Sequence, residues 1–450
     1  SRHFQPIIIG IGPLLFQQTP FGQILHTAFA PQYLANASSL VLPTVIQLIG
    51  RIAQTSFFEL FPDCLKACLV ALTSFFSLDD TSFSCFLKVI KSQKPLNMGL
   101  FAGEILSRCA DFAGLFYCDN FDVKLDYFEG LGMLSGYLGN LDLNAFEAAF
   151  YASNDLNVQC RIIKASGAYL KGFNDASEKQ IDGISLVAKW SELVSNCLRS
   201  ASETSSDPKA QMNLFEACKY LCQRIVGIIK KDVLGLLLAL VLFALQSNDE
   251  SALSSTFPVL SACSFKLKQD IIPLLQQVWI PLGQRVEEIC LKGSHNRHVI
   301  VELERQTIAL LIALFSANLA QSILPIAPDQ YYLVCLNALK ETADFALKRS
   351  ALAVFSRSLV LNRALLSKEF VFQSILPECL SSLSTQIGKE NVLEANCQSF
   401  INEFANFVSL AHNVYGSELC AYLSLNGLDV SCVKDQKAFK AMLTALISSK

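Results

Sequence analysis

The sequence predicts an all-α protein in which helix pairs stack into a solenoid. From about residue 40 onward, apolar helical segments of about 15 to 20 residues recur, separated by short breaks that carry Asp, Asn, Ser or Pro. The hydrophobic fraction of 52% and the mean hydropathy of +0.38 are high, as expected when interior repeats bury helix faces on both sides. No Gly/Pro-rich linker divides the 450 residues, which favours one continuous array over several globular domains.

Two helix pairs show the repeat most clearly. The first combines a short helix at 145–151, a capped turn at Asn154-Asp155 and a second helix at 158–173. In the second pair, Pro328 opens a helix, Glu341-Thr342 breaks it, and the next helix runs from 345 to 360 with its basic residues largely off the apolar stripe. An Asp-bearing turn with basic residues early in the second helix is typical of HEAT-type repeats. We therefore expect a HEAT-type superhelix over residues 1–450.

No membrane insertion is predicted. The strongest apolar run, residues 233–245, has thirteen residues, whereas roughly 18 to 20 are needed to cross a bilayer; we expect a buried helix. The first 31 residues are broken by Pro6, Pro13 and Pro20 and lack a continuous apolar region followed by a cleavage site, so no signal peptide is expected. The chain starts with Ser1, and we expect a longer protein upstream.

The cysteines and histidines do not predict an enzyme. Sixteen cysteines at irregular spacings, without CxxC, favour free thiols in a reducing compartment, the cytosol or nucleus. The most suggestive group, Cys290 with His295-Asn296-Arg297-His298, lacks HExxH and a nearby third ligand, which favours a solvated turn over a metal site or a nucleophile. No nucleotide-binding glycine motif is present. We expect no catalytic residue, no metal and no cofactor.

Charge is distributed unevenly around the net value of -3. Residues 111–155 contain eight acids and one base, whereas residues 340–368 contain six bases and two acids, and the last seventeen residues contain four lysines and one Asp. In a solenoid such bases can form a stripe that attracts phosphates or an acidic protein. The alternative is that they are ordinary solvated helix faces.

Five segments, in chain order, resemble the tRNA exportins, the exportin-T branch of the importin-β family. The most detailed is 257–282, where a Lys-bearing turn leads into IIPLLQQVWIPL, similar to the family's "PFLQQ…PL" helix. The others are 125–129, 157–173, 370–379 and 437–443. The resemblance is to the C-terminal half of an exportin-T; it is clearer over 121–450 than over 1–120, and the family's N-terminal Ran-binding repeats are expected to be absent from this chain.

The resemblance implies a nuclear export receptor. Such a receptor binds mature tRNA together with Ran-GTP in the nucleus, passes through pores lined by nucleoporins, and releases tRNA in the cytoplasm after GTP hydrolysis. It shuttles between nucleus and cytoplasm, and this chain alone is expected to bind Ran poorly. The family's C-terminal arch helps wrap the tRNA elbow and acceptor arm, which suits the basic bias of residues 340–450.

A receptor for every tRNA should read backbone and shape rather than base sequence. Lys and Arg on an inner surface are then the candidate contacts, while the 32 phenylalanines are assigned to helix packing. No family contact residue is carried over by position. The candidate tRNA-binding residues are Lys164, Lys171, Lys292, Arg297, His298, Lys340, Lys348, Arg349, Arg357, Lys437 and Lys440.

Two other functions remain open from the sequence. A karyopherin that carries protein cargo would have the same repeats but an acidic concave face, because many such cargoes present basic signals. The acidic stretch at 111–155 is compatible with it. A HEAT-repeat scaffold without a transport role would show no Ran-dependent binding.

Overall fold

The computed structural model describes residues 42–54, 57–93, 98–109, 112–177, 184–205, 207–292, 297–362, 365–387 and 392–449, together with Gln23 and Thr27. Every regular element in these ranges is a helix, which confirms the all-α prediction. The expectations for residues 1–31 fall almost entirely outside the described residues. The chain divides into two compact units, Ser1–Leu236 and Leu237–Lys450, which are described separately.

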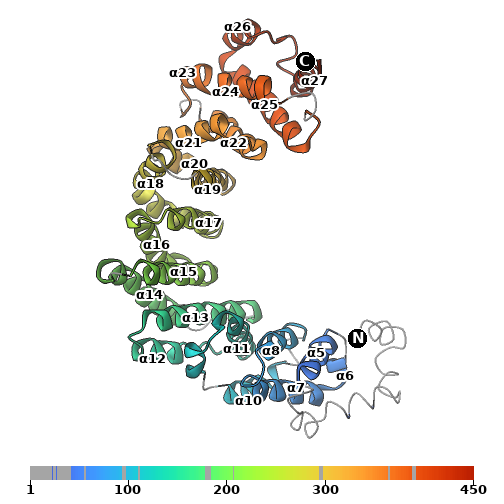
Figure 1. Ribbon diagram of the computed structural model, residues 1–450, viewed down its shortest axis with the longest axis vertical. Helices are drawn as coiled ribbons and strands as arrows, with labels where there is room; N and C mark the ends of the chain where they lie inside the picture. Colours follow the sequence, from blue (N-terminus) through green and yellow to red (C-terminus); the bar gives the residue numbers. More distant parts are fainter. Residues whose placement is uncertain are drawn as a thin grey trace. The chain divides into compact units, whose positions relative to one another are not determined.

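Unit 1 is built from helix pairs in two layers (Figure 1). The first helices of the pairs are α7 (Pro62–Phe75), α10 (Ala102–Arg108), α12 (Asn144–Ala152) and α14 (Ile184–Thr204). Each packs against the second helix that follows it: α8 (Thr81–Lys91), α11 (Leu125–Leu138), α13 (Leu156–Ala176) and α15 (Pro208–Ile225). Successive second helices also pack against each other, beginning with α5 (Leu42–Ile52) on α8. The remaining short helices are α6 (Phe57–Leu60), η1 (Ala113–Tyr117), η2 (Phe121–Lys124) and η3 (Lys230–Val233).

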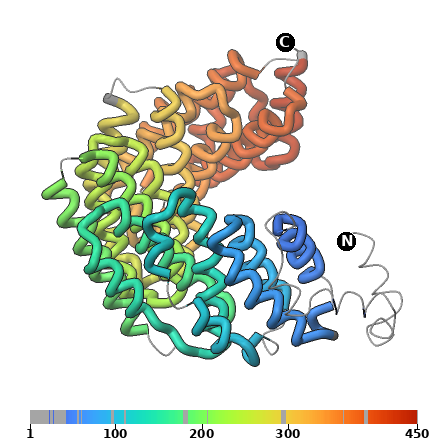
Figure 2. The backbone as a smooth tube through the Cα atoms, turned by 60° about the horizontal axis from the view of Figure 1, so that its bottom comes forward, coloured from blue at the N-terminus to red at the C-terminus, as the bar shows by residue number. Residues whose placement is uncertain are grey.

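Unit 2 repeats the arrangement (Figure 2). Its second helices are α17 (Glu250–Leu267), α19 (Arg297–Ser316), α22 (Phe345–Leu361), α25 (Ala395–Tyr415) and the C-terminal α27 (Gln436–Ser449), each packed against the next. The opposite layer contains α18 (Ile272–Glu287), α21 (Pro328–Glu341) and α24 (Leu376–Ser381) in succession. Connecting helices are η4 (Lys268–Ile271), η5 (Glu288–Lys292), α20 (Ala320–Ile323), η6 (Leu324–Ile326), α23 (Lys368–Phe370), η8 (Val371–Ile375), η9 (Ser382–Gln386) and α26 (Ser417–Leu425). Stacked helix pairs within each unit are what the HEAT-type prediction required.

Aspartates start several second helices, as the pattern of Asp-bearing turns predicted. The Asp155 carboxylate accepts from the Asn157 backbone N–H at 2.8 Å and caps α13. Asp344 does the same for α22, accepting from the backbone N–H groups of Ala346 and Leu347. Asp207, Asp249 and Asp435 cap α15, α17 and α27. Each such cap satisfies a backbone donor that the helix leaves free, a contribution of about 1 kcal/mol.

Glycines bring α11 and α13 into backbone contact. A Cβ built on Gly132 would lie 1.9 Å from the Tyr169 carbonyl oxygen, and one on Gly172 would lie 1.9 Å from the Glu129 carbonyl oxygen. Gly136, one turn beyond Gly132, continues the contact, with its Cβ position 2.7 Å from the carbonyl oxygen of Phe173. Side chains set the distance between packed helices, so these two helices approach closely only because the three positions lack one.

The long apolar run is a buried helix, as predicted. It forms α16 (Leu234–Gln246), where Leu237, Leu240 and Val241 are at most 1% exposed. Among the described residues, no single helix has both the length and the apolar composition to cross a membrane. By length and composition alone, the helices Arg297–Ser316 and Ala320–Ile326 together could cross a membrane, but the two are bent by 113° relative to each other. All sixteen cysteines are free thiols, in agreement with the sequence.

Candidate nucleic-acid interface

Three of the predicted tRNA-binding residues line one groove in unit 2. Arg349, Arg357 and Lys440 surround a groove of about 550 Å³ on the second-helix layer. Its walls come from α19, α22, α25 and α27, and its other lining residues are Ile312, Ser350, Ala353, Gln398, Ser399, Asn402 and Glu403. We call this the basic groove.

Helix packing holds the three cations in place. Arg349 and Arg357 are eight residues apart on α22, about two turns, and both side chains are exposed. The Arg357 guanidinium reaches across to α19, where the Ile312 carbonyl and the Ser316 hydroxyl each lie 3.4 Å from Nη1. Lys440 stands on α27, whose buried Phe439 contacts Phe404 of α25. Among the described residues, none of the three cations has an acidic side chain within 4.0 Å.

One carboxylate shares the basic groove with these cations. Glu403 Oε1 accepts hydrogen bonds from the Ser356 hydroxyl at 2.6 Å and from the Asn406 amide at 3.0 Å. Because both donors fix this oxygen, the carboxylate stays at the groove wall. Three cations and one carboxylate leave the groove with a net charge of +2.

An apolar pocket adjoins the basic groove. It has a volume of about 810 Å³ and shares Ala353, Arg357 and Glu403 with the groove. The lining is completed by four apolar side chains, Phe315, Val360, Leu361 and Leu410, and by four polar ones, Ser316, Asn318, Ser356 and Asn406. The Val360 side chain is 70% exposed. We call this the apolar pocket.

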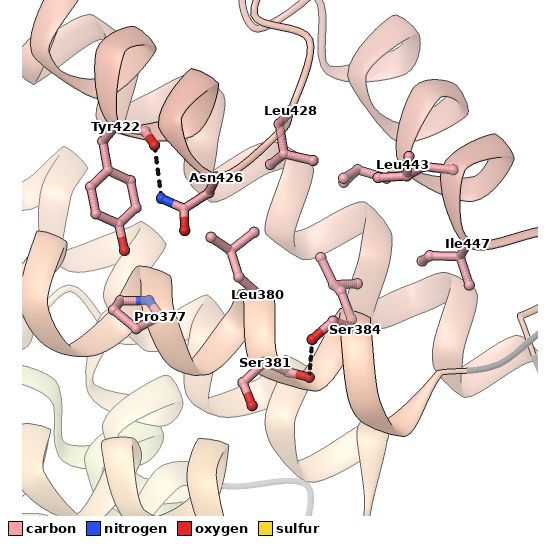
Figure 3. A pocket seen from close by; sticks show the side chains of 11 residues that line it. Pro377, Leu380, Ser381, Ser384, Tyr422, Asn426, Leu428, Leu443 and Ile447 are labelled. Carbon is pink, nitrogen blue, oxygen red and sulfur yellow. Dashed lines mark hydrogen bonds between the residues drawn. The ribbon is translucent and has the colours of Figure 1, made fainter. Parts of the chain in front are cut away.

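A separate cavity of about 370 Å³ lies between α27, α24 and α26 (Figure 3). Leu443 and Ile447 of α27 face Leu380 of α24 across it, and Tyr422 and Asn426 close one side. None of the predicted basic residues lines this cavity. The C-terminal helix therefore contributes Lys440 to the basic groove and leucine and isoleucine side chains to a different space.

The structure contradicts Lys348 as a tRNA contact. Its side chain is completely buried, and Nζ donates to the Leu339 carbonyl and, at 2.9 Å, to the Ser382 hydroxyl. Burial lowers the pKa of Lys348. One residue further along, Arg349 is exposed, because each step rotates the side chain by about 100° around the helix. Lys348 connects α21, α22 and η9 and has no surface to offer a ligand.

Lys164 and Lys171 lie in unit 1 and have acidic partners there. Lys171 donates to the Glu129 carboxylate, which also pairs with Lys91 at 2.6 Å, while Lys164 lies 3.6 Å from Asp122. Burial by itself would raise the pKa of Glu129, but the hydrogen bonds from Lys171 and Lys91 outweigh it and lower that pKa. Lys171 thus links α13 to α11, and its role in tRNA binding stays a prediction.

The other candidates do not line the basic groove. Arg297 and His298 are exposed at the start of α19, Lys340 is exposed near the end of α21, and Lys437 is exposed on α27. Lys292 ends η5, but its side chain and the segment 293–296, with His295, fall outside the described residues. Whether these residues contact tRNA also stays a prediction.

No metal or nucleophile site emerges in the described part of the chain. No group of three or more His, Cys, Asp or Glu there could hold a metal ion. Cys290 is buried, which raises its pKa to about 12, and Glu304 adds to that rise. Its thiol is therefore protonated at neutral pH and is a poor nucleophile.

Sequence reasoning missed the residues of α25. Gln398, Asn402 and Asn406 recur at intervals of four, with Ser399 and Glu403 beside them at the same interval. Side chains spaced by four share one helix face. This polar stripe is the signal that predicts an open face on α25. Its residues line the basic groove and the apolar pocket, with Asn402 exposed and the other four half-buried.

Comparison with protein families confirms the resemblance seen in the sequence. The family model for Exportin-T matches residues 146–364. This range contains the segments 157–173 and 257–282, as well as Arg349 and Arg357, whereas 125–129, 370–379 and 437–443 lie outside it. The basic groove is thus completed by two helices, α25 and α27, beyond the matched range.

Comparison with solved structures found a chain from "Crystal Structure of Importin Beta in an Ammonium Sulfate Condition", with a TM-score of 0.49 and 10% sequence identity. The likeness covers 94% of this chain and 57% of the importin beta chain. A search of curated protein sequences found no match.

Proposed function

From an exportin-T match over residues 146–364, we propose that this chain is part of a nuclear export receptor for mature tRNA. The match indicates a karyopherin-type transport receptor rather than an enzyme. The proposed receptor binds tRNA with Ran-GTP in the nucleus, contacts nucleoporins during passage, and releases tRNA in the cytoplasm after GTP hydrolysis. We further propose that residues 1–450 form its C-terminal HEAT-repeat array.

The basic groove is the observation that supports an RNA cargo. Arg349 and Arg357 have no acidic partner among the described residues. The two protein contacts of Arg357 are both made by Nη1, so both guanidinium groups keep N–H donors for phosphate oxygens. Arginine presents a planar fork of donors that matches a phosphate in two-point contact. Because helices carry all three cations, their backbone positions along the groove are fixed, which suits recognition of an RNA backbone.

The positive charge of the basic groove favours an RNA cargo over a protein cargo with a basic signal. A basic peptide would be repelled by a groove with three cations and one carboxylate. In the acidic stretch 111–155, Asp155 caps α13, and Glu129, Asp122 and Glu147 pair with lysines. The basic groove therefore favours an anionic cargo.

The test is tRNA binding with and without Ran-GTP. Labelled tRNA is titrated with the chain, and with a longer form carrying upstream sequence, and the shift is measured by anisotropy. We expect tRNA binding that Ran-GTP strengthens in the longer form. The double variant Arg349→Glu/Arg357→Glu should weaken binding about tenfold or more, because each reversal replaces a phosphate contact by repulsion.

A matched control is available in unit 2. Lys266 and Lys434 are exposed but do not line the basic groove, so Lys266→Glu/Lys434→Glu changes the net charge by the same amount. The control should lose much less affinity than the groove variant. Equal losses would show a general charge effect, and absence of tRNA binding by the longer form with Ran-GTP would reject the proposed function.

A further inference from the structure

The apolar pocket and the basic groove form one continuous site with two kinds of wall. Arg357, Ala353 and Glu403 line both. On one side lie Arg349 and Lys440, and on the other lie Phe315, Val360 and Leu410. A ligand seated at the shared residues is therefore exposed to cations at one end and to apolar side chains at the other.

A phosphate alone does not account for this arrangement. It gains nothing from the apolar side chains, and the Glu403 carboxylate repels it. A nucleotide matches each part of the site, because its phosphate pairs with arginine and lysine while its flat base covers apolar side chains. The base must be unpaired, since a base inside a duplex is stacked and its Watson–Crick edge is occupied.

Glu403 is placed to read such a base. Its Oε1 is already fixed by the Ser356 hydroxyl and the Asn406 amide, and an ionised carboxylate has further acceptor sites on its other oxygen. Carboxylates accept hydrogen bonds from the N–H groups of bases. Guanine offers two neighbouring N–H donors on its Watson–Crick edge, whereas uracil offers a single one.

We propose that the joined groove and pocket bind one unpaired nucleotide of the RNA cargo, with its phosphate on Arg349, Arg357 and Lys440 and its base in the apolar pocket, hydrogen-bonded to Glu403. A guanine is preferred over a uracil. This inference rests on the proposed function and adds a single-nucleotide contact to recognition of the RNA backbone.

The experiment compares RNA duplexes of equal length that are blunt or carry one bulged guanosine or one bulged uridine. Binding of the chain to each labelled duplex is measured by anisotropy, with tRNA measured in parallel. We expect the bulged guanosine to bind about tenfold tighter than the blunt duplex, the size of effect that burying one base produces. The bulged uridine should gain less.

Two variants test the base contact without removing a cation. Glu403→Gln retains an oxygen for Ser356 and Asn406 but loses the charged acceptor, so the preference for guanosine over uridine should disappear. Val360→Asn makes the apolar pocket polar at an exposed position and should reduce the gain from either bulge. Leu425→Asn, at a position 88% exposed and outside both cavities, is the matched control and should change nothing.

The outcomes separate this inference from the proposed function. If tRNA binds but blunt and bulged duplexes bind equally well, the single-nucleotide site is rejected and the tRNA receptor stands. If Glu403→Gln strengthens binding of all three duplexes alike, Glu403 only repels phosphate and base reading is rejected. If the chain binds bulged guanosine selectively while the longer form with Ran-GTP does not bind tRNA, the nucleotide site stands and tRNA export is rejected.

Discussion

Cationic side chains on the second helices have different uses in the two units. In unit 1, Lys91 and Lys171 both pair with Glu129 and join α8, α11 and α13. In unit 2, Arg349 and Arg357 on α22 have no acidic partner among the described residues and line the basic groove. The comparison shows that position on a second helix does not decide whether a cation is available to a ligand. The neighbouring helix decides it, by supplying a carboxylate or an open polar face.

The distance between neighbouring second helices also differs between the two units. The α11–α13 contact is closed by Gly132 and Gly172, each opposite a carbonyl oxygen of the other helix. Between α22 and α25 the residues that line the groove include the short side chains of Ser350, Ala353, Ser399 and Asn402, and space of about 550 Å³ remains. A glycine contact leaves no room for a ligand between helices, whereas short polar side chains leave a groove. The α11–α13 contact in unit 1 therefore leaves no space for a ligand, whereas α22 and α25 in unit 2 leave an open groove.

The largest expected effect is at the glycine contact. Gly132→Ala should destabilise unit 1 by about 3 kcal/mol or more, because the new Cβ meets a backbone carbonyl that moves only if the helices separate. Chemical denaturation followed by circular dichroism measures it. Gly235→Ala is the control: a Cβ there meets nothing within 4 Å, and alanine favours a helix. Equal stability of the two variants would contradict the close α11–α13 contact.

The second effect is at Glu129. Glu129→Gln should cost about 1–3 kcal/mol, because it leaves Lys91 and Lys171 without their shared carboxylate in a partly buried site. Glu147→Gln, which breaks the more exposed pair with Lys189, should cost clearly less stability. If both variants lose the same stability, the Glu129 cluster is an ordinary surface pair.

The dependence of stability on pH gives a second test of the ion pairs of Glu129. Its folded-state pKa lies below 4.5, so its contribution to stability is fully present above pH 4.5 and is lost as pH falls through the folded-state pKa. The stability of Glu129→Gln, measured as the denaturation midpoint between pH 6 and pH 3, should therefore fall less steeply than that of the unmodified chain. Identical pH profiles would show that the two lysines do not lower this pKa.

Substitutions at the adjacent residues Lys348 and Arg349 should have opposite effects, one on stability and the other on tRNA binding. Lys348→Met removes the hydrogen bonds to the Leu339 carbonyl and Ser382 and should destabilise unit 2 by about 1–3 kcal/mol without changing tRNA affinity of the folded protein. Arg349→Met should do the reverse, with little loss of stability and about threefold weaker tRNA binding. Weaker tRNA binding by folded Lys348→Met would restore it as a contact.

Much of the helix arrangement could be predicted because its signals are local. The helix expected from Pro328 to the break at Glu341-Thr342 is α21 (Pro328–Glu341), and the helix expected at 345–360 is α22 (Phe345–Leu361). A proline starts the first, and the Asp344 cap starts the second. The α11–α13 contact could not be predicted in this way. A glycine inside a helical pattern indicates a weaker helix, and which backbone lies opposite it depends on how the repeats stack.

The site was predicted only in part, for a similar reason. Arg349, Arg357 and Lys440 were candidates because of their charge, but charge alone did not separate them from Lys348, whose long side chain reaches a buried carbonyl. Glu403 was not a candidate, because an isolated acid in a polar stripe carries no charge signal of its own. Its place in the groove depends on the packing of α25 against α22, where Ser356 donates to its carboxylate.

The salt dependence of tRNA binding tests the central contrast between the units most directly. The logarithm of affinity is measured against the logarithm of salt concentration for the unmodified chain, for Arg349→Gln/Arg357→Gln and for Lys91→Gln/Lys171→Gln. The arginine variant should lose about 1.5 units of slope, because roughly 0.7 to 0.9 is lost for each phosphate contact removed. The lysine variant should keep the slope of the unmodified chain. A flattened slope in the lysine variant with an unchanged slope in the arginine variant would contradict the account.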